Sequence, residues 1–249
     1  MIEQKIQIPT ASGTAEGILF RPKQEGRWPG VIQYTDIGGI RVSQQEMARR
    51  LAGAGYVVLM PNVFYRTGRL PLFDFPLKFG EERTMKRLAE LSGPLTPEAI
   101  ACDVSDYVDF LARRDSVKPG CIGAVGYCFT GKMALYTAMS RPDEIAAAAS
   151  FHAGGLATDA PNSPHLLLGL PIKARLYFGH AINDKSMPAE AIERLNHALD
   201  AWGGKYESEV YEGAYHSWTV PDSPVYNQLQ AERAFEKLTQ LFAETFGFV

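Results

Sequence analysis

Short apolar runs alternate along this chain with longer amphipathic ones, and this alternation restricts the fold more than any other feature. The apolar runs, which predict strands, are 31–35, 56–61, 122–127, 145–151, 174–179 and 206–212. A helical period in the segments between them predicts helices over 43–54, 78–91, 97–113, 130–140, 188–201 and 226–246. Strands that alternate with helices in this way predict an α/β fold, with a mostly parallel central sheet flanked by helices on both faces.

The ends of these elements carry further signals. Two additional strands, over 3–9 and 15–21, are joined by Thr-Ala-Ser-Gly, which predicts a hairpin at the edge of the sheet. Ser43 and Thr96 are expected to cap helices, and Pro97 stands at a first helical position. The length of 249 residues fits one large α/β domain, so we expect a single domain over 1–249.

The segment 62–96 departs from the regular spacing. It is long, rich in aromatic and basic residues, and interrupted by Pro71, Pro76 and Pro94. Long loops inside compact domains are often functional, so we interpret this segment as a lid or a pocket-wall insertion. An irregular helical excursion without a role in binding is the alternative.

Composition argues against several classes of function. The net charge is −3 and no run of Lys or Arg stands out, so nucleic acid is not an expected partner. Cys102, Cys121 and Cys128 lack metal-ligand spacing, which predicts reduced thiols in a cytoplasmic protein without a metal or a cofactor. The N-terminal residues lack the apolar core of a signal peptide, and no apolar stretch approaches the roughly 20 residues that span a bilayer.

The motif that carries chemistry is Gly126-Tyr127-Cys128-Phe129-Thr130-Gly131, between a predicted strand and a predicted helix. A nucleophile elbow needs small residues around a sharp turn of this kind, which presents the nucleophile at a helix N-terminus. The helix dipole there stabilises a thiolate and a developing oxyanion. A buried structural cysteine is the alternative for Cys128, because free cysteine is among the most buried residue types.

Two later strand-end loops carry the groups that such a nucleophile requires. Asp184 follows the run 174–179, and His216 follows the run 206–212. In an α/β-hydrolase the acid follows the nucleophile in the sequence and the histidine comes last. The candidate triad is therefore Cys128, His216 as the proton acceptor, and Asp184 as the group that orients it.

These residues resemble those of the dienelactone hydrolase family of α/β-hydrolases, and the resemblance covers most of the chain. Two further segments match, Gln-Tyr-Thr-Asp-Ile-Gly-Gly at 33–39 and Pro-Asn-Val-Phe-Tyr-Arg at 61–66. The resemblance implies that Asp36 is an accessory acid that contacts the cysteine and helps to ionise it. It also implies that Arg66 orients this acid and binds an anionic substrate.

The resemblance further implies an oxyanion hole made by the backbone N–H groups of Ile37 and Phe129. The chain departs from the family pattern at three places: Asp36 replaces a glutamate, Thr130 replaces a glycine, and Val220 replaces an arginine. That arginine helps to hold the carboxylate of dienelactone in the best-known members. The identity of the substrate therefore does not follow from the resemblance.

Aromatic residues and a histidine flank the proposed site. Tyr34, Phe64 and Trp218 suggest a pocket for an apolar, cyclic or aromatic acyl group, although each could equally belong to the core. His152 ends a predicted strand and either faces the pocket or serves as a structural hydrogen-bonding group.

The sequence therefore predicts a hydrolase that cleaves an ester or a lactone through a thioacyl-enzyme intermediate. A general small-molecule carboxylesterase of the same fold is one alternative. A non-catalytic α/β-hydrolase that binds a ligand or a partner, with Cys128 as a redox sensor, is another. The expected partner is a small-molecule ester or lactone substrate, and the chain is expected to be a monomer or a small homo-oligomer.

Overall fold

The apolar runs pair into one eight-stranded sheet with the order β1-β2-β4-β3-β5-β6-β7-β8. The strands are β1 (Ile2–Thr10), β2 (Gly13–Arg21), β3 (Trp28–Tyr34), β4 (Val57–Pro61), β5 (Val117–Tyr127), β6 (Ile145–Phe151), β7 (Arg175–Ala181) and β8 (Tyr206–Tyr211). The hairpin β1–β2 is antiparallel and lies at the sheet edge, β2 is antiparallel to β4, and the other pairs are parallel. The computed structural model describes residues 1–169 and 171–247.

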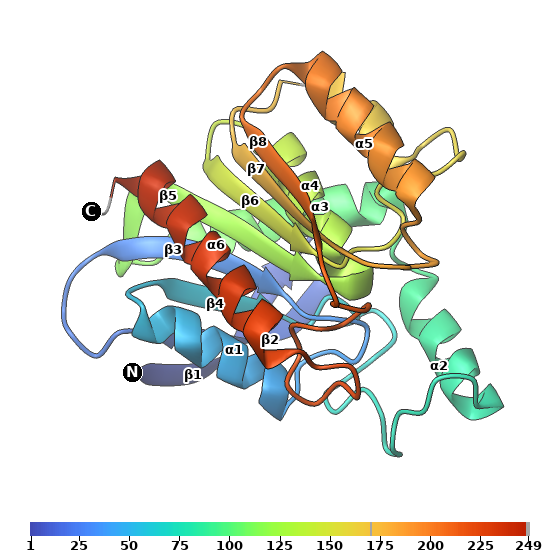
Figure 1. Cartoon of the computed structure of the whole chain (residues 1–249). Helices are drawn as coiled ribbons and strands as arrows, with labels where there is room; N and C mark the ends of the chain where they lie inside the picture. Colours follow the sequence, from blue (N-terminus) through green and yellow to red (C-terminus); the bar gives the residue numbers. More distant parts are fainter. Residues whose placement is uncertain (170, 248–249) are drawn as a thin grey trace.

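Helices cover both faces of this sheet (Figure 1). They are α1 (Val42–Gly53), α2 (Glu82–Ser92), α3 (Pro97–Ala112), α4 (Gly131–Ser140), α5 (Ala189–Trp202) and α6 (Gln228–Phe246), with short 3₁₀ helices η1 (Cys128–Thr130) and η2 (Pro164–Gly169). The buried apolar residues of α1 and most of those of α6 belong to one hydrophobic cluster, and the buried apolar side chains of α3, α4 and α5 belong to another. The prediction of an α/β-hydrolase fold with helices on both faces is therefore confirmed.

The central strands are buried on both faces, which explains why the sequence reads as continuous apolar runs. All five residues of β4 are buried, and so are the last seven of β5. Strands covered by helices on both sides have no solvent-facing position that would call for a polar residue. The carboxyl ends of the parallel strands meet at one edge, where α/β sheets place their sites.

Two of the predicted helix starts differ from the structure. Ser43 is not the cap of α1; it is buried within the helix, whose N-cap is Arg41 without a capping side-chain hydrogen bond. The helix expected from residue 78 begins only at Glu82, because Gly80 has a φ of +92°, outside the right-handed helical region. The Thr96 cap is confirmed by its hydroxyl, which accepts a hydrogen bond from the backbone N–H three residues later at 3.2 Å.

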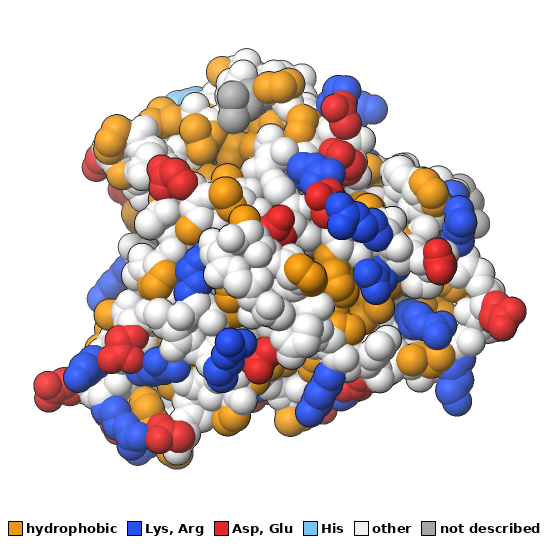
Figure 2. Space-filling view, turned by 180° about the vertical axis from the view of Figure 1, so that it is seen from behind, with side chains coloured by type: hydrophobic (Ala, Val, Ile, Leu, Met, Phe, Trp, Pro, Cys, Tyr) orange, Lys and Arg blue, Asp and Glu red, His pale blue; other side chains and the backbone are white. Residues whose placement is uncertain are grey.

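The surface mixes both signs of charge. On the face shown in Figure 2, Lys and Arg side chains lie among Asp and Glu side chains. Several of these groups form ion pairs, such as Arg175 with Glu207 at 2.7 Å. Among residues 1–169 and 171–247, no helix is both long enough and apolar enough to cross a membrane.

Candidate active site

Strand β5 ends in a sharp turn that carries Cys128. This residue has a φ of +56° and begins the short helix that leads into α4. A Cβ at Gly126 would lie 2.8 Å from the carbonyl oxygen of Thr130, and one at Gly131 would lie 2.5 Å from the Cβ of Ala153. Only glycine fits at both places, so the two glycines permit the tight turn that a nucleophile elbow requires.

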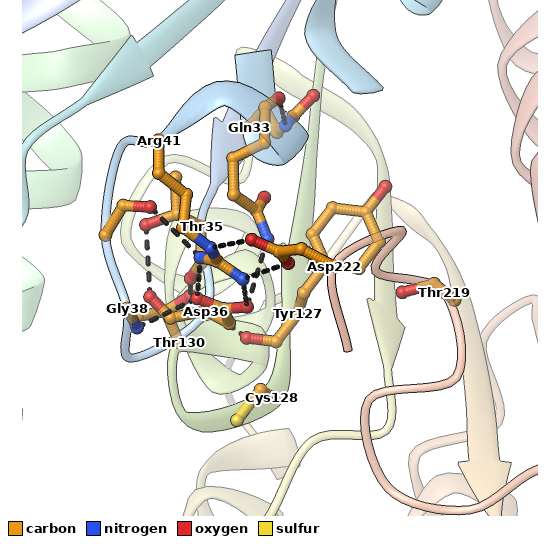
Figure 3. Close-up of polar contacts among 12 residues, drawn as sticks. Gln33, Thr35, Asp36, Gly38, Arg41, Tyr127, Cys128, Thr130, Thr219 and Asp222 are labelled. Atoms are coloured by element: carbon orange, nitrogen blue, oxygen red, sulfur yellow. Dashed lines mark hydrogen bonds and ion pairs between the residues drawn. The ribbon is translucent and has the colours of Figure 1, made fainter. Parts of the chain in front are cut away.

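Thr130 stands where a second glycine is usual, and the turn accommodates it. Its φ is −89°, on the negative side that residues with a side chain adopt, so this position does not require glycine for its backbone conformation. Its hydroxyl donates to the carbonyl oxygen of Thr35 and lies 3.2 Å from the carbonyl oxygen of Tyr127. The Thr130 side chain therefore ties the elbow to the loop that follows β3 (Figure 3).

The structure brings Cys128, His216 and Asp184 together in one hydrogen-bonded chain. The Nε2 of His216 is 3.1 Å from the Sγ of Cys128, and its Nδ1 is 2.6 Å from the Oδ2 of Asp184. The three residues follow the carboxyl ends of β5, β8 and β7. This is the order and the geometry of a nucleophile, a base and an orienting acid.

The electrostatics of these hydrogen-bonded residues favour an ion pair of His216 and Asp184. Burial works against the imidazolium, but hydrogen bonds to Asp184 and Cys128 outweigh it and raise the pKa of His216 to about 10. Burial likewise tends to raise the pKa of Asp184, but hydrogen bonds from His216 and Ser186 lower it below its usual value. An ionised carboxylate next to Nδ1 stabilises the imidazolium that forms when His216 accepts a proton.

Ser186, which no sequence motif singled out, fixes the carboxylate of Asp184. Its Oγ donates to the Oδ1 of Asp184 at 2.6 Å, and its backbone N–H donates to the same oxygen at 2.8 Å. The other oxygen, Oδ2, is left to His216. The sequence signal is its position two residues after an aspartate, where such turn hydrogen bonds form.

The side chain of His152 forms a hydrogen bond with the backbone of the elbow. Its Nδ1 accepts a hydrogen bond of 3.1 Å from the backbone N–H of Cys128, so the ring proton lies on Nε2, which is 2.7 Å from the Oγ1 of Thr219. Burial, and the nearby charge of His216, hold the pKa of His152 well below its usual value. His152 is a neutral structural hydrogen-bonding group and does not line the cavity next to Cys128.

Cys128 opens into a cavity of about 630 Å³, a size that accommodates a small molecule. One wall comes from the segment 71–79 and is mostly apolar: Pro71, Leu72, Phe73, Phe75, Leu77, Lys78 and Phe79. The remaining lining residues are Asp36, Ile37, Gly38, Ile40, Arg41, Ser217, Asp222, Ser223 and Pro224. Within the described part of the chain, no three His, Cys, Asp or Glu side chains gather as a metal ion would require.

Three residues expected in the pocket lie in the core instead. Tyr34 and Phe64 are almost fully buried, and the Tyr34 hydroxyl is 2.7 Å from the hydroxyl of Thr137 in α4. Trp218 is also fully buried and stacks on Tyr211, with ring centroids 4.9 Å apart. None of the three lines the cavity.

Arg66 is likewise absent from the cavity lining. Its guanidinium forms an ion pair with the buried Asp103 of α3, with Nη2 2.9 Å from Oδ1, and reaches Ser12 at 3.0 Å. Asp36 does line the cavity with Cys128, but its carboxylate accepts hydrogen bonds from Arg41 at 2.6 and 2.7 Å. The structure thus places Asp36 in the same cavity as Cys128 and gives Arg66 other partners.

The two residues expected to supply the backbone N–H groups of an oxyanion hole are Ile37 and Phe129. Ile37 lines the cavity in the loop after β3, and Phe129 directly follows Cys128 in η1, ahead of α4. Amide groups at these two places are where an α/β-hydrolase binds the developing oxyanion.

A sequence model of the Dienelactone hydrolase family matches residues 15–246. The chain belongs to the dienelactone hydrolase family. As a member, it is a hydrolase of the ester- or lactone-cleaving type. This agrees with the resemblance found in the sequence and with the elbow geometry.

Individual relatives match along most of their length. A protein of Synechocystis sp. named "Putative carboxymethylenebutenolidase" is 27% identical over 242 residues, which cover 95% of this chain and 94% of the relative. The carboxymethylenebutenolidase of Rhodococcus opacus is 27% identical over 211 residues, covering 83% and 78%. The crystal structure titled "Putative Dienelactone Hydrolase" from Klebsiella pneumoniae has a TM-score of 0.85 at 22% identity, covering 97% of this chain and 98% of that one, and shows a shared fold.

Proposed function

We propose that this dienelactone hydrolase family member cleaves an ester or a lactone with Cys128 as its nucleophile. The observation that carries the proposal is a continuous series of hydrogen bonds. It runs from the Sγ of Cys128 to the Nε2 of His216 at 3.1 Å, and from the Nδ1 of His216 to the Oδ2 of Asp184 at 2.6 Å. The position of the thiol at a strand-to-helix turn facing a cavity supports the same role.

The proton shared between the thiol of Cys128 and the Nε2 of His216 lies on His216 when acylation begins, and the sulfur attacks the carbonyl carbon. A C–S bond forms, and the electron pair of the carbonyl moves onto oxygen, where the N–H groups of Ile37 and Phe129 stabilise it. The C–O bond to the leaving group then breaks, and His216 returns the proton to the departing oxygen. Asp184 stabilises the imidazolium until this proton transfer.

Hydrolysis of the thioacyl-enzyme uses the same groups in a second round. His216 takes a proton from water, and the oxygen attacks the thioester carbon. When the C–S bond breaks, His216 returns the proton to the sulfur, and the carboxylic acid leaves. Atoms balance, since each cycle consumes one water and restores the thiol of Cys128.

Two substrate classes fit this site. Relatives named carboxymethylenebutenolidase favour a cyclic enol ester, that is, a lactone. The apolar wall at 71–79 favours the second class, simple esters with an apolar acyl group. Kinetics with a dienelactone and with a 4-nitrophenyl ester, side by side, would separate the two.

The nucleophile is tested by the substitution Cys128→Ala, with Cys102→Ala as the matched control because Cys102 is an exposed free thiol outside the cavity. On 4-nitrophenyl butyrate, C128A is expected to lose at least about 10³-fold in kcat, as removal of a nucleophile does. C102A should retain the activity of the parent protein. Unchanged turnover by C128A would contradict the proposal.

The redox-sensor alternative is tested with the unaltered protein. Rapid labelling of Cys128 by iodoacetamide, without hydrolysis of either ester class, would favour that alternative. Loss of esterase activity in step with labelling supports the nucleophile, and mass spectrometry of the acylated protein should then place the acyl group on Cys128.

A further inference from the structure

One guanidinium in the cavity wall is held between two carboxylates (Figure 3). The Nη1 and Nη2 of Arg41 donate to Asp36 at 2.6 and 2.7 Å. Its Nε and Nη2 donate to Asp222 at 2.7 and 2.9 Å. Both hydrogen-bonding edges of Arg41 are therefore occupied by side chains of the protein, although all three residues line the cavity that holds Cys128.

This cluster leaves an excess of negative charge beside the nucleophile. Two carboxylates and one guanidinium carry a formal charge of −1 when all are ionised. Burial tends to raise the pKa of Asp222, but its hydrogen bonds from Arg41 lower it below its usual value, so this carboxylate is ionised at neutral pH.

The other cation of the cavity lining is Lys78, and it lies at the rim. Its side chain is 67% exposed and its Nζ is 3.4 Å from the Oε1 of Glu81. A solvated ammonium at such a place contributes little to the binding of an anion, because water and salt screen it. Val220, which stands where family members carry an arginine, is fully buried and adds no charge.

We propose that the Asp36–Arg41–Asp222 cluster makes the site selective for esters of uncharged acids and against substrates whose acyl group bears a carboxylate. The inference rests on the proposed function and names its substrate class. A bound carboxylate normally requires a free guanidinium edge, which Arg41 does not offer, and it would meet two like charges at short range. The apolar side chains of residues 71–79 complete a wall that suits a neutral, apolar acyl chain.

Asp222 is the residue whose removal frees one edge of Arg41. In Asp222→Ala, the Nε and Nη2 groups lose their acceptor while Asp36 keeps its two hydrogen bonds. A substrate carboxylate can then take the place of the lost one. The test compares 4-nitrophenyl hexanoate with mono(4-nitrophenyl) adipate, two esters that differ only in a terminal methyl or carboxylate.

The parent protein should hydrolyse the hexanoate with the higher kcat/KM. D222A should raise the adipate-to-hexanoate ratio of kcat/KM about tenfold, mainly through KM, since one repulsive charge is removed at close range. Asp222→Asn, which keeps the shape of the side chain, should raise the ratio by a smaller factor and covers the case that D222A does not fold. Asp159→Asn is the matched control, because Asp159 also pairs with an arginine, Arg194, but lies outside the cavity.

The possible outcomes separate the proposed selectivity from the proposed hydrolytic function. A ratio that rises in D222A and D222N but not in D159N supports the selectivity. Turnover of the hexanoate with an unchanged ratio in both Asp222 variants, or equal use of both esters by the parent protein, overturns the selectivity and leaves the hydrolytic function standing. If the parent protein hydrolyses a dienelactone but neither ester, the selectivity is overturned and the hydrolytic function stands. No turnover of either ester or of the dienelactone overturns the proposed function and this inference with it.

Discussion

The backbone N–H of Cys128 donates a hydrogen bond of 3.1 Å to the Nδ1 of His152. His152 directly follows β6, and its side chain therefore holds the main chain of the proposed nucleophile in place. Cys128 has a left-handed backbone, which costs on the order of 1–3 kcal/mol for a residue other than glycine and persists only where neighbouring groups stabilise it. His152 performs this function as a neutral ring, since Thr219 accepts the proton on its other nitrogen.

Removal of this hydrogen-bond acceptor should displace Cys128 while leaving substrate binding nearly unchanged. We expect His152→Ala to lower kcat on a 4-nitrophenyl ester about 10²-fold, the usual effect of a misplaced reacting group, with a small change in KM. His152→Asn should recover part of the loss, because its amide oxygen can accept the same hydrogen bond. His197→Ala, at an exposed position of α5, is the control. Equal kcat values for H152A and the parent protein would show that the elbow holds without this bond.

The three residues of the proposed triad could be selected from the sequence because of the order of the strands in the sheet. Cys128, Asp184 and His216 each follow an apolar run that became a parallel strand, and the ends of parallel strands meet at one edge. Local patterns at three distant places were therefore enough to bring the side chains together. The spacing along the sequence carried no such information.

The other residues of the cavity could not be selected from the sequence in this way. Arg41 and Asp222 are 181 residues apart and neither belongs to a recognisable motif, so their pairing depends on the tertiary structure alone. The pocket aromatics also could not be selected by composition. Tyr34 and Trp218 each lie two residues from a predicted site residue yet are buried in the core, whereas Phe73, farther from any such residue in the sequence, lines the cavity.

The raised pKa of His216 predicts how stability depends on pH. The folded protein keeps the His216 proton up to about pH 10, whereas the unfolded chain releases it near 6.5. The folded state thus binds more protons in this window, and its free energy of unfolding falls as pH rises, by at most about 1.4 kcal/mol per pH unit. Urea titrations at pH 6, 8 and 9.5 should show this loss, and His216→Gln should reduce it. An identical pH dependence in H216Q would contradict the assignment.

The close approach of Gly131 to β6 predicts a steric effect. A Cβ there would lie 2.5 Å from the Cβ of Ala153 and 2.9 Å from the Oγ of Ser150. We expect Gly131→Ala to lower the free energy of unfolding by about 1–3 kcal/mol, as overpacking does. Gly53→Ala, at the end of α1, meets no atom within 4 Å and should stabilise by up to about 1 kcal/mol through helix propensity. Thermal unfolding of both variants measures the contrast, and equal shifts would rule out the steric cause.

Thr130 offers a test that separates catalysis from stability. Its hydroxyl donates to the carbonyl oxygen of Thr35, which directly precedes Asp36 and Ile37 in the loop after β3. Thr130→Val keeps the shape and leaves that buried oxygen without its donor, which should lower the free energy of unfolding by about 1–3 kcal/mol. Since the loop also carries the N–H proposed for the oxyanion, kcat should fall about tenfold. Thr137→Val is the control: it removes a buried hydroxyl bonded to Tyr34 and should cost similar stability with kcat unchanged. Equal losses of kcat in T130V and T137V would show that Thr130 acts through general stability, whereas a loss confined to T130V assigns it the positioning of this loop.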